Sequence, residues 1–446
     1  MEANSAMRGW LIVWIVVVGL IGFALSRKSV RKTTPSVGLT IAFLAHLTIL
    51  HWFGAFIHTL PWYYTPDDSY FVELGFVQSV YGVVAFGFGC LILSPFLFNL
   101  FGFSWLRERP FIPHPRLPRV YMITGLIFYS VLEPIIGDIP SIRTFVYSGW
   151  NLLIVGICLK CWASWQANNK KALMRWLIIA GLFPFFTMVT QGFLGVGMGV
   201  LLVILVFVSS FYRPRWRTIV GAVIIMYLGL SFYVNYMSSR DELRERVWGG
   251  EELPSRVEVI SDMVGNFEAL DIHNEEHLGH LDGRINLNFL VGAAVDYLKS
   301  GGAEYARGET IWQSLLAMIP RILWSEKPIV MGGSEMVAKY TGMHFAEGTS
   351  VAMGLVMDFY VNFSTVGVVI GFIILGVVLR FLDVIAARRL NQGDWQGFTF
   401  WYLPGLSFMG EPHLFQITMT MASSIVFCIF VNKYILPRFA GKRVSQ

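Results

Sequence analysis

Long apolar runs separated by short polar segments make up most of the chain. Eleven runs approach the length of about 20 residues that a helix needs to cross a bilayer core. They lie at 9–26, 37–59, 77–101, 120–137, 144–163, 174–191, 193–211, 218–237, 352–380, 396–411 and 414–436. Because only a helix satisfies its own backbone hydrogen bonds in hydrocarbon, this pattern predicts an all-α polytopic membrane protein with about eleven transmembrane helices.

The pattern breaks over residues 238–349. Charged segments such as RDELRERVWGGEELPSR alternate there with two apolar stretches, INLNFLVGAAVDYL and TIWQSLLAMIPRILW. Both stretches are too short to span a membrane but long enough for interfacial or re-entrant helices. The sequence therefore predicts an N-terminal membrane bundle (1–237) of about eight spans, one large outer loop (238–349) and a C-terminal membrane bundle (350–446) of about three spans.

Composition agrees with a membrane protein. Of the 446 residues, 55% are hydrophobic and only 14% are charged, against about 25% charged residues in soluble proteins. The net charge of +5 comes mainly from basic residues beside the apolar runs, so it does not indicate nucleic acid as a partner. All four cysteines lie within expected spans, which leaves no extracellular disulfide framework.

The basic residues predict the orientation. Twenty of the 34 Lys and Arg residues lie in six alternate segments, after the first, third, fifth, seventh and ninth spans and in the C-terminal tail. Cytoplasmic loops carry such an excess, so the N-terminus is expected outside and the C-terminus in the cytoplasm. Residues 238–349 then face outward. Their ten basic and eighteen acidic residues do not disturb this topology, because long loops cross regardless of charge.

Ionisable side chains near the outer ends of the spans suggest a polar cavity open to the outside. They are His51, His58, Glu133, Asp138, Asp358, Glu411 and His413. A position at the headgroup level explains the first four more simply. For the last three, a functional site is an equal alternative, because ionisable groups at membrane depth are costly.

Two further groups of the outer loop are candidates for binding. Arg284, Arg321 and Lys327 combine planar guanidinium forks with a point charge, which suits a pyrophosphate at the membrane surface. Pairing with neighbouring acids such as Asp282 or Glu326 is the alternative, and residue types alone do not decide between them. The histidines of HNEEHLGHLDGR do not form H-E-x-x-H, and a solvated cluster explains them better, so no metal ion and no cofactor is expected.

Three sequence motifs, together with the order of segments, resemble the oligosaccharide repeat-unit polymerase family, the O-antigen polymerase-like proteins of bacterial envelopes. The motifs are DGRINLNFLVGAAVDYL, GETIWQSLLAMIPRILWSEKP and GTSVAMGLVMDFYVNFSTVGVVIGF. I-P-R-x-x-W-x-x-K-P is the most specific part of the resemblance. It implies a multi-pass glycosyltransferase of the bacterial inner membrane that joins repeat units carried on undecaprenyl pyrophosphate into an O-antigen or exopolysaccharide chain at the periplasmic face.

The resemblance also implies roles and partners. It implies three candidate ligands of the lipid pyrophosphate. They are Arg284 in the R-x-N motif, and Arg321 and Lys327 in the P-R-x-x-W-x-x-K-P motif. The implied partners are the lipid-linked oligosaccharide, the lipid bilayer, and a chain-length regulator and a flippase of the same pathway. The incoming hydroxyl needs a general base within about 3 Å. The candidates are His344, Glu347, Asp358, Glu411 and His413.

The chain departs from the family's pattern in two places. Many members carry an Arg at the outer turn between two mid-chain spans, whereas the segment TQGFLGVG has Gln191 there and no Arg. Members often read N-F-G before the second half of the ninth span, whereas this chain has Asn362, Phe363 and Ser364.

Two alternatives come from other classes of protein. The related O-antigen ligases place His-Asn just ahead of the span that matches TSVAMGLVMDFY. The nearest histidine here is His344, which favours the polymerase. A transporter or lipid flippase of the same pathway is the non-enzymatic alternative, and a single long outer loop without repeat symmetry between the halves argues against it.

Overall fold

In the computed structural model, the described part of the chain consists of helices and connections, with no strand. The structure describes residues 2–30, 35–63, 65–101, 111–136, 140–212, 216–319, 324, 326–327, 331–345, 351, 353–410 and 412–440. The expected all-α fold class is confirmed for these residues.

The described residues up to position 248 form twelve α-helices. They are α1 (Glu2–Val30), α2 (Leu39–Leu47), α3 (Phe53–Ile57), α4 (Pro66–Phe88), α5 (Ser94–Phe101), α6 (Leu117–Ile127), α7 (Glu133–Ile136), α8 (Pro140–Gln166), α9 (Lys170–Gly181), α10 (Phe183–Gln191), α11 (Leu194–Ser209) and α12 (Trp216–Trp248). Single turns of π-helix join α2 to α3, α4 to α5 and α6 to α7, so each of these pairs is one continuous helical segment.

Nine α-helices follow in the described residues beyond position 248. They are α13 (Leu253–Gly265), α14 (Glu275–Ile285), α15 (Asn288–Lys299), α16 (Glu309–Ala317), α17 (Gly333–Thr341), α18 (Gly354–Asn391), α19 (Trp395–Gly405), α20 (Leu414–Phe430) and α21 (Leu436–Ala440). The first five are short and fall within the outer loop expected at 238–349.

Seven helical segments of the described chain are long and apolar enough to cross a membrane, fewer than the eleven expected. They are Ala6–Ser26, Leu39–Ile57, Asp68–Phe101, Arg143–Gln166, Lys170–Gln191, Gly354–Asn391 and Leu414–Phe439. The spans expected at 120–137 and 193–211 correspond to shorter apolar helices, Leu117–Leu132 and Leu194–Ser209. The span expected at 396–411 is only the eleven-residue α19, which carries Pro404 just before its end. The span expected at 218–237 falls in α12, which is not among the seven segments.

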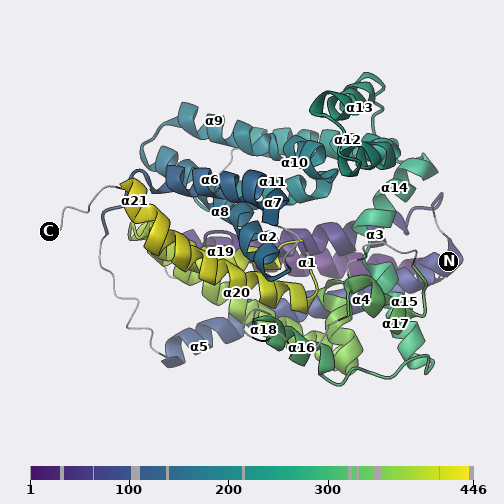
Figure 1. The fold of residues 1–446 in the computed structure, drawn as a ribbon. Coiled ribbons are helices and arrows are strands. Elements are labelled where there is room, and N and C mark those ends of the chain that lie inside the picture. Colours follow the sequence, from purple (N-terminus) through teal and green to yellow (C-terminus); the bar gives the residue numbers. More distant parts are fainter. Residues whose placement is uncertain are drawn as a thin grey trace.

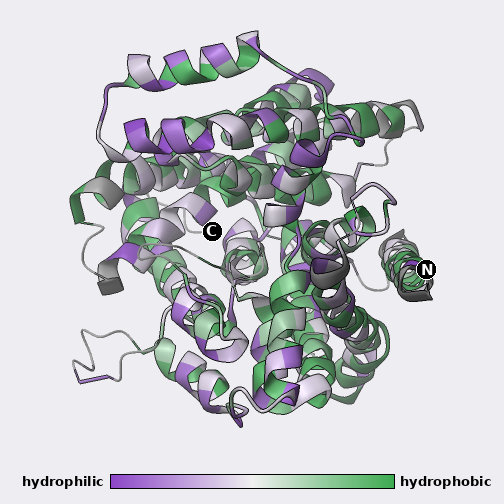
Figure 2. Ribbon diagram, turned by 90° about the vertical axis from the view of Figure 1, so that its right-hand side faces the viewer, coloured by the Kyte–Doolittle hydropathy of each residue, from purple (hydrophilic) through white to green (hydrophobic). Residues whose placement is uncertain are grey.

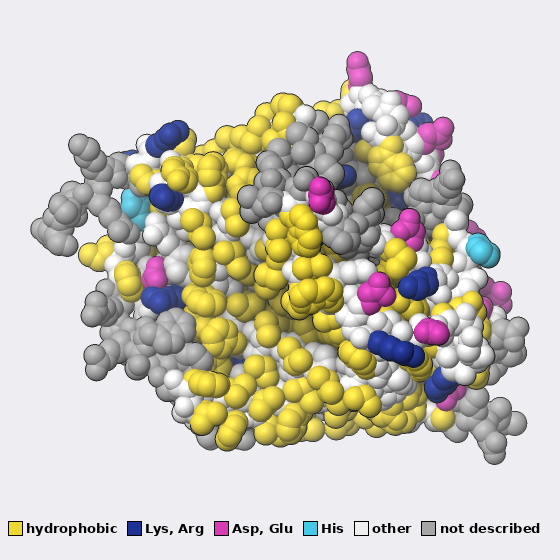
Figure 3. All heavy atoms as spheres, turned by 60° about the horizontal axis from the view of Figure 1, so that its bottom comes forward, with side chains coloured by type: hydrophobic (Ala, Val, Ile, Leu, Met, Phe, Trp, Pro, Cys, Tyr) yellow, Lys and Arg dark blue, Asp and Glu magenta, His cyan; other side chains and the backbone are white. Residues whose placement is uncertain are grey.

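The two ends of the helical bundle differ (Figure 1). The N-terminus and helices α13, α14, α15 and α17 lie toward one end, which we name the loop end, and the C-terminus and α21 lie at the other. Figure 2 looks onto the loop end and shows hydrophilic stretches among mostly hydrophobic helices. On the face drawn in Figure 3, apolar side chains cover the middle and charged ones gather at both ends, with the acidic ones concentrated at the loop end. This distribution suits a bundle in a membrane, because charged groups are costly in hydrocarbon.

Helix α15 is packed into the loop end against α4, α17 and α18. Its close approach to α4 depends on glycine. A Cβ atom at Gly292 would overlap the carbonyl oxygen of Phe71, and one at Gly75 would overlap that of Asn288. The first apolar stretch of the outer loop is therefore a short helix buried within the bundle, whereas α16, from the second stretch, buries only one face against α18 and α20.

A buried carboxylate ties α18 to the segment before α2. Asp383 is fully buried and accepts a hydrogen bond from Nη1 of Arg380 at 2.8 Å. Four more donors complete its shell: Ser36 Oγ (2.7 Å), Val37 N (2.9 Å), Leu39 N (3.2 Å) and Thr40 Oγ1 (3.1 Å). This fully hydrogen-bonded ion pair fixes the start of α2 on the second half of α18.

Helix α18 is broken once, at Phe363 and Ser364. Ser364 has φ 56° and ψ −152°, a conformation found almost only in glycine. Asn362 holds the break in place, because its amide donates to the Asp358 carbonyl at 2.7 Å and to Thr310 Oγ1 at 2.6 Å. The serine that departs from the N-F-G pattern of the polymerases therefore adopts a glycine-like backbone.

We expect Ser364→Gly to raise the free energy of unfolding by about 1 kcal/mol, because glycine adopts this conformation without strain. Thermal unfolding of the purified protein in detergent would measure the change. Ser26→Gly is the control, since Ser26 is an exposed residue within regular helix, where glycine is unfavourable. An unchanged or lower midpoint for Ser364→Gly would show that the break carries no strain.

Candidate functional site

The second half of α12 carries an aromatic and basic face. Tyr233, Tyr236, Arg240 and Arg244 follow one another at spacings of three or four residues, which places them on one side of the helix. With 33 residues α12 is about 50 Å long, more than the ~30 Å of a bilayer core. Its charged part therefore reaches into the loop end, where it contacts α13 and α14.

Arg244 packs on the turn between α10 and α11. Its guanidinium carbon lies 4.4 Å from the ring centroid of Phe193 and 5.4 Å from that of Trp248. A Cβ atom at Gly192 would lie 3.1 Å from Cγ of Arg244. Its buried Nε has no hydrogen-bond partner among the described residues. An arginine thus reaches the outer turn that lacks one in the sequence, but it comes from α12.

Arg284 brings a third positive charge to the same place. It is exposed at the end of α14, and its charge acts on both Arg244 and Tyr233. Arg240 is paired with the exposed carboxylate of Asp241 at 2.9 Å, whereas Arg244 and Arg284 make no ion pair with any described residue. We name Arg240, Arg244 and Arg284 the arginine trio.

The arginine trio is a group of like charges in which only Arg240 has an ion-pair partner among the described residues. Burial lowers the pKa of the Arg244 guanidinium, and the charges of Arg240 and Arg284 lower it further, whereas Tyr236 and Asp241 act in the opposite direction. An arginine stays charged at any physiological pH. The downward shift comes first from burial and only in smaller part from the two neighbouring arginines. Guanidinium forks match phosphate oxygens, so an anion is a suitable ligand for this group.

Asp282 fixes the end of α14 on which Arg284 stands. Its Oδ2 lies 2.9 Å from Nε2 of His58 and accepts a hydrogen bond from the Tyr63 hydroxyl at 3.3 Å. Burial, and next the charge of Asp282, raise the pKa of Tyr63, so this hydroxyl stays protonated and donates. Nδ1 of His58 lies 2.9 Å from Oγ of Ser69 in α4. Asp282, the alternative partner for Arg284, thus contacts a histidine.

His51 belongs to a second buried network. Its Nδ1 lies 2.7 Å from Oδ1 of Asn288 and 2.9 Å from Oγ of Ser79, and the Asn288 amide donates to the His51 carbonyl at 2.7 Å. His51 and His58 are only 0% and 1% exposed. Both hold α14 and α15 against the bundle, and the headgroup position expected for both stays a prediction. Asp138 lies outside the described residues, as does the side chain of Glu133.

Among the candidate general bases, the structure brings Asp358 and His413 together. Asp358 is buried and accepts hydrogen bonds from Thr310 Oγ1 (2.9 Å) and from the Leu414 backbone N–H (2.8 Å). Burial lowers the pKa of His413, and the charge of Asp358 opposes this. His413 is partly exposed and stacks on Phe415, with ring centroids 5.9 Å apart. It is therefore the more accessible base of the two.

The other predicted site residues are dispersed. His344 is exposed in the segment after α17. Lys327 is buried, and its Nζ donates to the Ile319 carbonyl at 3.0 Å, so it stabilises the chain after α16. Glu347, Glu411 and Arg321 lie outside the described residues. In Figure 1, α16 lies on the lower side of the bundle and α14 on the upper side, with α3, α4 and α15 between them. Arg284 is thus grouped with two arginines of α12 and not with Lys327.

Two residues of the arginine trio were missed from the sequence. Arg240 and Arg244 stand at helical spacing, which indicates a charged helix but not its neighbours. One signal was available, since Tyr233 and Tyr236 precede them on the same face. The contact with Gly192 and Phe193 joins segments about 50 residues apart and has no local signature.

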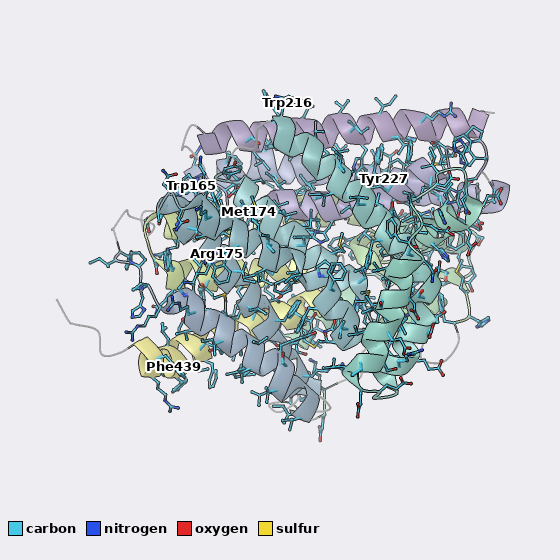
Figure 4. The ribbon with its side chains drawn as sticks, turned by 90° about the horizontal axis from the view of Figure 1, so that it is seen from above. Trp165, Met174, Arg175, Trp216, Tyr227 and Phe439 are labelled. Atoms are coloured by element: carbon cyan, nitrogen blue, oxygen red, sulfur yellow. The ribbon has the colours of Figure 1, made fainter. Side chains whose placement is uncertain are left out.

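The first half of α12 offers an apolar approach to the arginine trio. Trp216 and Ile225 are 70% and 68% exposed, and most of the side chains described between them are exposed as well. Figure 4 shows Trp216 and Tyr227 on this half, apart from Met174 and Arg175 on α9. An apolar helix that ends in basic groups suits an amphiphile with an apolar tail and an anionic head.

Comparisons with known proteins give a family but no characterised relative. No curated protein and no solved structure matches the chain. One family model matches residues 108–401, more than half of the chain, including all of α12, α14 and α18. The chain therefore belongs to the family described as Domain of unknown function (DUF8712).

Proposed function

We propose that the protein is a membrane glycosyltransferase that joins oligosaccharide repeat units carried on undecaprenyl pyrophosphate into a longer glycan. The observation that carries the proposal is the arginine trio at the outer end of an exposed apolar helix. A pyrophosphate on a long polyprenyl chain has the charge and the apolar length that this arrangement would bind. The motif resemblance to the polymerases supports the same substrate class.

In this proposal the arginine trio binds the pyrophosphate of the donor. Donor and acceptor exchange one bond: the acceptor hydroxyl oxygen attacks the anomeric carbon, and the bond from that carbon to the pyrophosphate breaks. Negative charge develops on the leaving pyrophosphate, and prepositioned guanidinium groups stabilise it, as the donors of an oxyanion hole do. The pyrophosphate leaves on its lipid, and the hydroxyl proton passes to a general base.

Among the described candidates His413 has the properties of a general base, since burial favours its neutral form and Asp358 would stabilise the imidazolium once it forms. It lies on the α18 and α20 side, away from the arginine trio, whereas the attacked carbon is bonded to the pyrophosphate at the trio, so His413 is not the base of this step. Arg321 lies in the most specific motif of the resemblance, and its contact with the pyrophosphate stays a prediction. Lys327 is better explained as a structural residue.

We propose that the loop end faces the periplasm of a bacterial inner membrane. The N-terminus and α13, α14, α15 and α17 lie toward that end, opposite the C-terminus (Figure 1). Reporters fused after Arg217 and after Arg389 should then read cytoplasmic, and one at Gly265 should read periplasmic. A cytoplasmic reading at Gly265 would reverse the orientation and remove the arginine trio from the face where the glycan is expected.

Trp248 offers a direct readout of donor binding, because it lies beside Arg244. Protein in nanodiscs should show a fluorescence change with undecaprenyl pyrophosphate at much lower concentration than with undecaprenyl monophosphate, since the second phosphate adds charge-assisted hydrogen bonds. In Arg244→Ala and Arg284→Ala this preference should disappear. Equal binding of both lipids by the native chain would rule out the pyrophosphate site.

A further inference from the structure

We propose that a polar cavity between α12, α13 and α14 binds a neutral or amino sugar of the acceptor glycan. The cavity has a volume of about 470 Å³ and lies on the outer part of α12. Its role as the acceptor site rests on the proposed glycosyltransferase function, whereas its affinity for sugar rests on its lining alone.

The lining combines the groups that bind sugars. Amide, hydroxyl and carboxylate side chains form the walls, among them Asn235, Ser239, Asp262 and Glu268. These groups accept and donate hydrogen bonds to vicinal hydroxyls. Val259 and Met263 supply an apolar floor for the C–H face of a ring. A mostly apolar ligand would leave the walls unpaired.

Two polar groups of the cavity are free to bind. Within the described chain, the Ser239 hydroxyl and the Asp262 carboxylate have no hydrogen-bond partner. The rim, by contrast, is fixed. The Asn235 amide donates to the Glu268 carbonyl at 2.7 Å, and its oxygen accepts from the Glu268 N–H at 2.9 Å. A preformed rim beside free acceptors favours binding, because less order has to be created when the ligand arrives.

The charge of the lining excludes other ligands. Four carboxylates, those of Glu242, Asp262, Glu268 and Glu276, border the cavity, and neither Lys nor Arg lines it. Glu242 is paired with Arg246 at 2.7 Å, and Glu268 lies 3.7 Å from His277, so Asp262 carries the charge that acts most directly on a ligand. A uronic acid or a phosphate would be repelled. No group of three or more His, Cys, Asp or Glu residues in the described chain is arranged to hold a metal ion. Neutral hydroxyls and ammonium groups are the ligands that this lining accommodates.

The cavity and the arginine trio occupy different faces of α12. Arg240 and Arg244 share one face with Tyr233 and Tyr236, whereas Ser239 and Glu242 line the cavity. The two sites are separated by about the diameter of one helix, roughly 10 Å. A donor pyrophosphate on one face and an acceptor sugar on the other would therefore be held within reach of each other.

Calorimetric titration of the full chain in nanodiscs with four disaccharides tests the site: one neutral, one N-acetylated, one with free amines and one with uronic acids. We expect the first three to bind and the fourth to fail. Ser239→Phe should abolish binding by filling the cavity, and Asp262→Asn should weaken it about tenfold. Glu252→Gln is the matched control, because Glu252 is an exposed acid of the same loop outside the cavity.

Several outcomes would overturn the proposal. They are the absence of binding by all four sugars, preferred binding of the uronic acid, unchanged binding in Ser239→Phe, and binding of Ca²⁺ in place of sugar. Undecaprenyl pyrophosphate titrated into the same nanodiscs separates this proposal from the proposed function. If the lipid binds and no sugar binds, the proposed sugar site is refuted and the proposed glycosyltransferase function stands. If sugar binds and the lipid does not, the sugar site stands and the proposed function is refuted.

Discussion

Replacing Arg244 by alanine should lower polymer formation by roughly 30-fold to 1000-fold, because about 2 to 4 kcal/mol of transition-state stabilisation is lost. Its guanidinium lies against Phe193 and Trp248 and faces the charges of Arg240 and Arg284. Length analysis of the glycan made by cells carrying the variant would measure the loss.

Arg246 provides the matched control for Arg244. It stands two residues later on α12, pairs with Glu242 at 2.7 Å and with Glu258 at 3.4 Å, and has no contact with the arginine trio. Exposed ion pairs contribute only about 0–1 kcal/mol, so Arg246→Ala should retain nearly full polymer length. Arg244→Lys should remain impaired, because lysine keeps the charge but loses the planar fork and the ring stacking.

The opposite pattern would contradict the role of Arg244. If Arg244→Ala and Arg246→Ala both reach the membrane at normal levels and both make full-length polymer, the arginine trio does not bind the leaving group. Loss of polymer accompanied by equal loss of protein from the membrane would mean that Arg244 only stabilises the turn between α10 and α11.

Asp383→Asn should cost about 3–5 kcal/mol of unfolding free energy, because it leaves the charge of Arg380 buried without its partner. The side chains of Arg380 and Asp383 are almost fully buried. The carboxylate also accepts hydrogen bonds from four donors before and at the start of α2. Thermal unfolding in detergent and protein abundance in the membrane should both fall.

Two further variants define this effect. Glu304→Gln removes an exposed partner of Arg307 at 4.0 Å and should change stability by less than about 1 kcal/mol. The double variant Arg380→Leu with Asp383→Leu should lose less than the sum of the single changes, because no unpaired buried charge remains. An Asp383→Asn protein that unfolds at the native temperature would show that the ion pair does not hold α2 to α18.

The helical class could be predicted from the sequence because apolar runs of membrane length carry a strong signal. The described residues contain fewer segments of membrane length than expected, in part because that signal does not register how helices end. α19 stops after eleven residues near Pro404, and α6 and α11 are short for a membrane crossing. Ser364 escaped detection for a different reason, since its glycine-like backbone is imposed by Asn362 and its neighbours in the fold.

The candidate site was predictable only in part. Arg284 could be predicted because it lies in a recognisable motif, but the other two arginines of the trio come from α12, about 40 residues earlier in the chain. The partners of His51 and His58 could not be predicted, because burial by α14 and α15 depends on long-range packing that no local pattern encodes. Asp358 and His413 were both identified from their cost at membrane depth, and their proximity followed from the fold.

Reconstitution of the purified chain with undecaprenyl-pyrophosphate-linked repeat units tests the central proposal most directly. The expected result is a ladder of glycans that grows by whole repeat units on the lipid, formed without a lipid A core acceptor and reduced by Arg244→Ala but not by Arg246→Ala. A glycan that is transferred only when a lipid A core is supplied would make the protein a ligase. Movement of the lipid-linked unit across the bilayer without any lengthening would make it a flippase, and either result would contradict the polymerase.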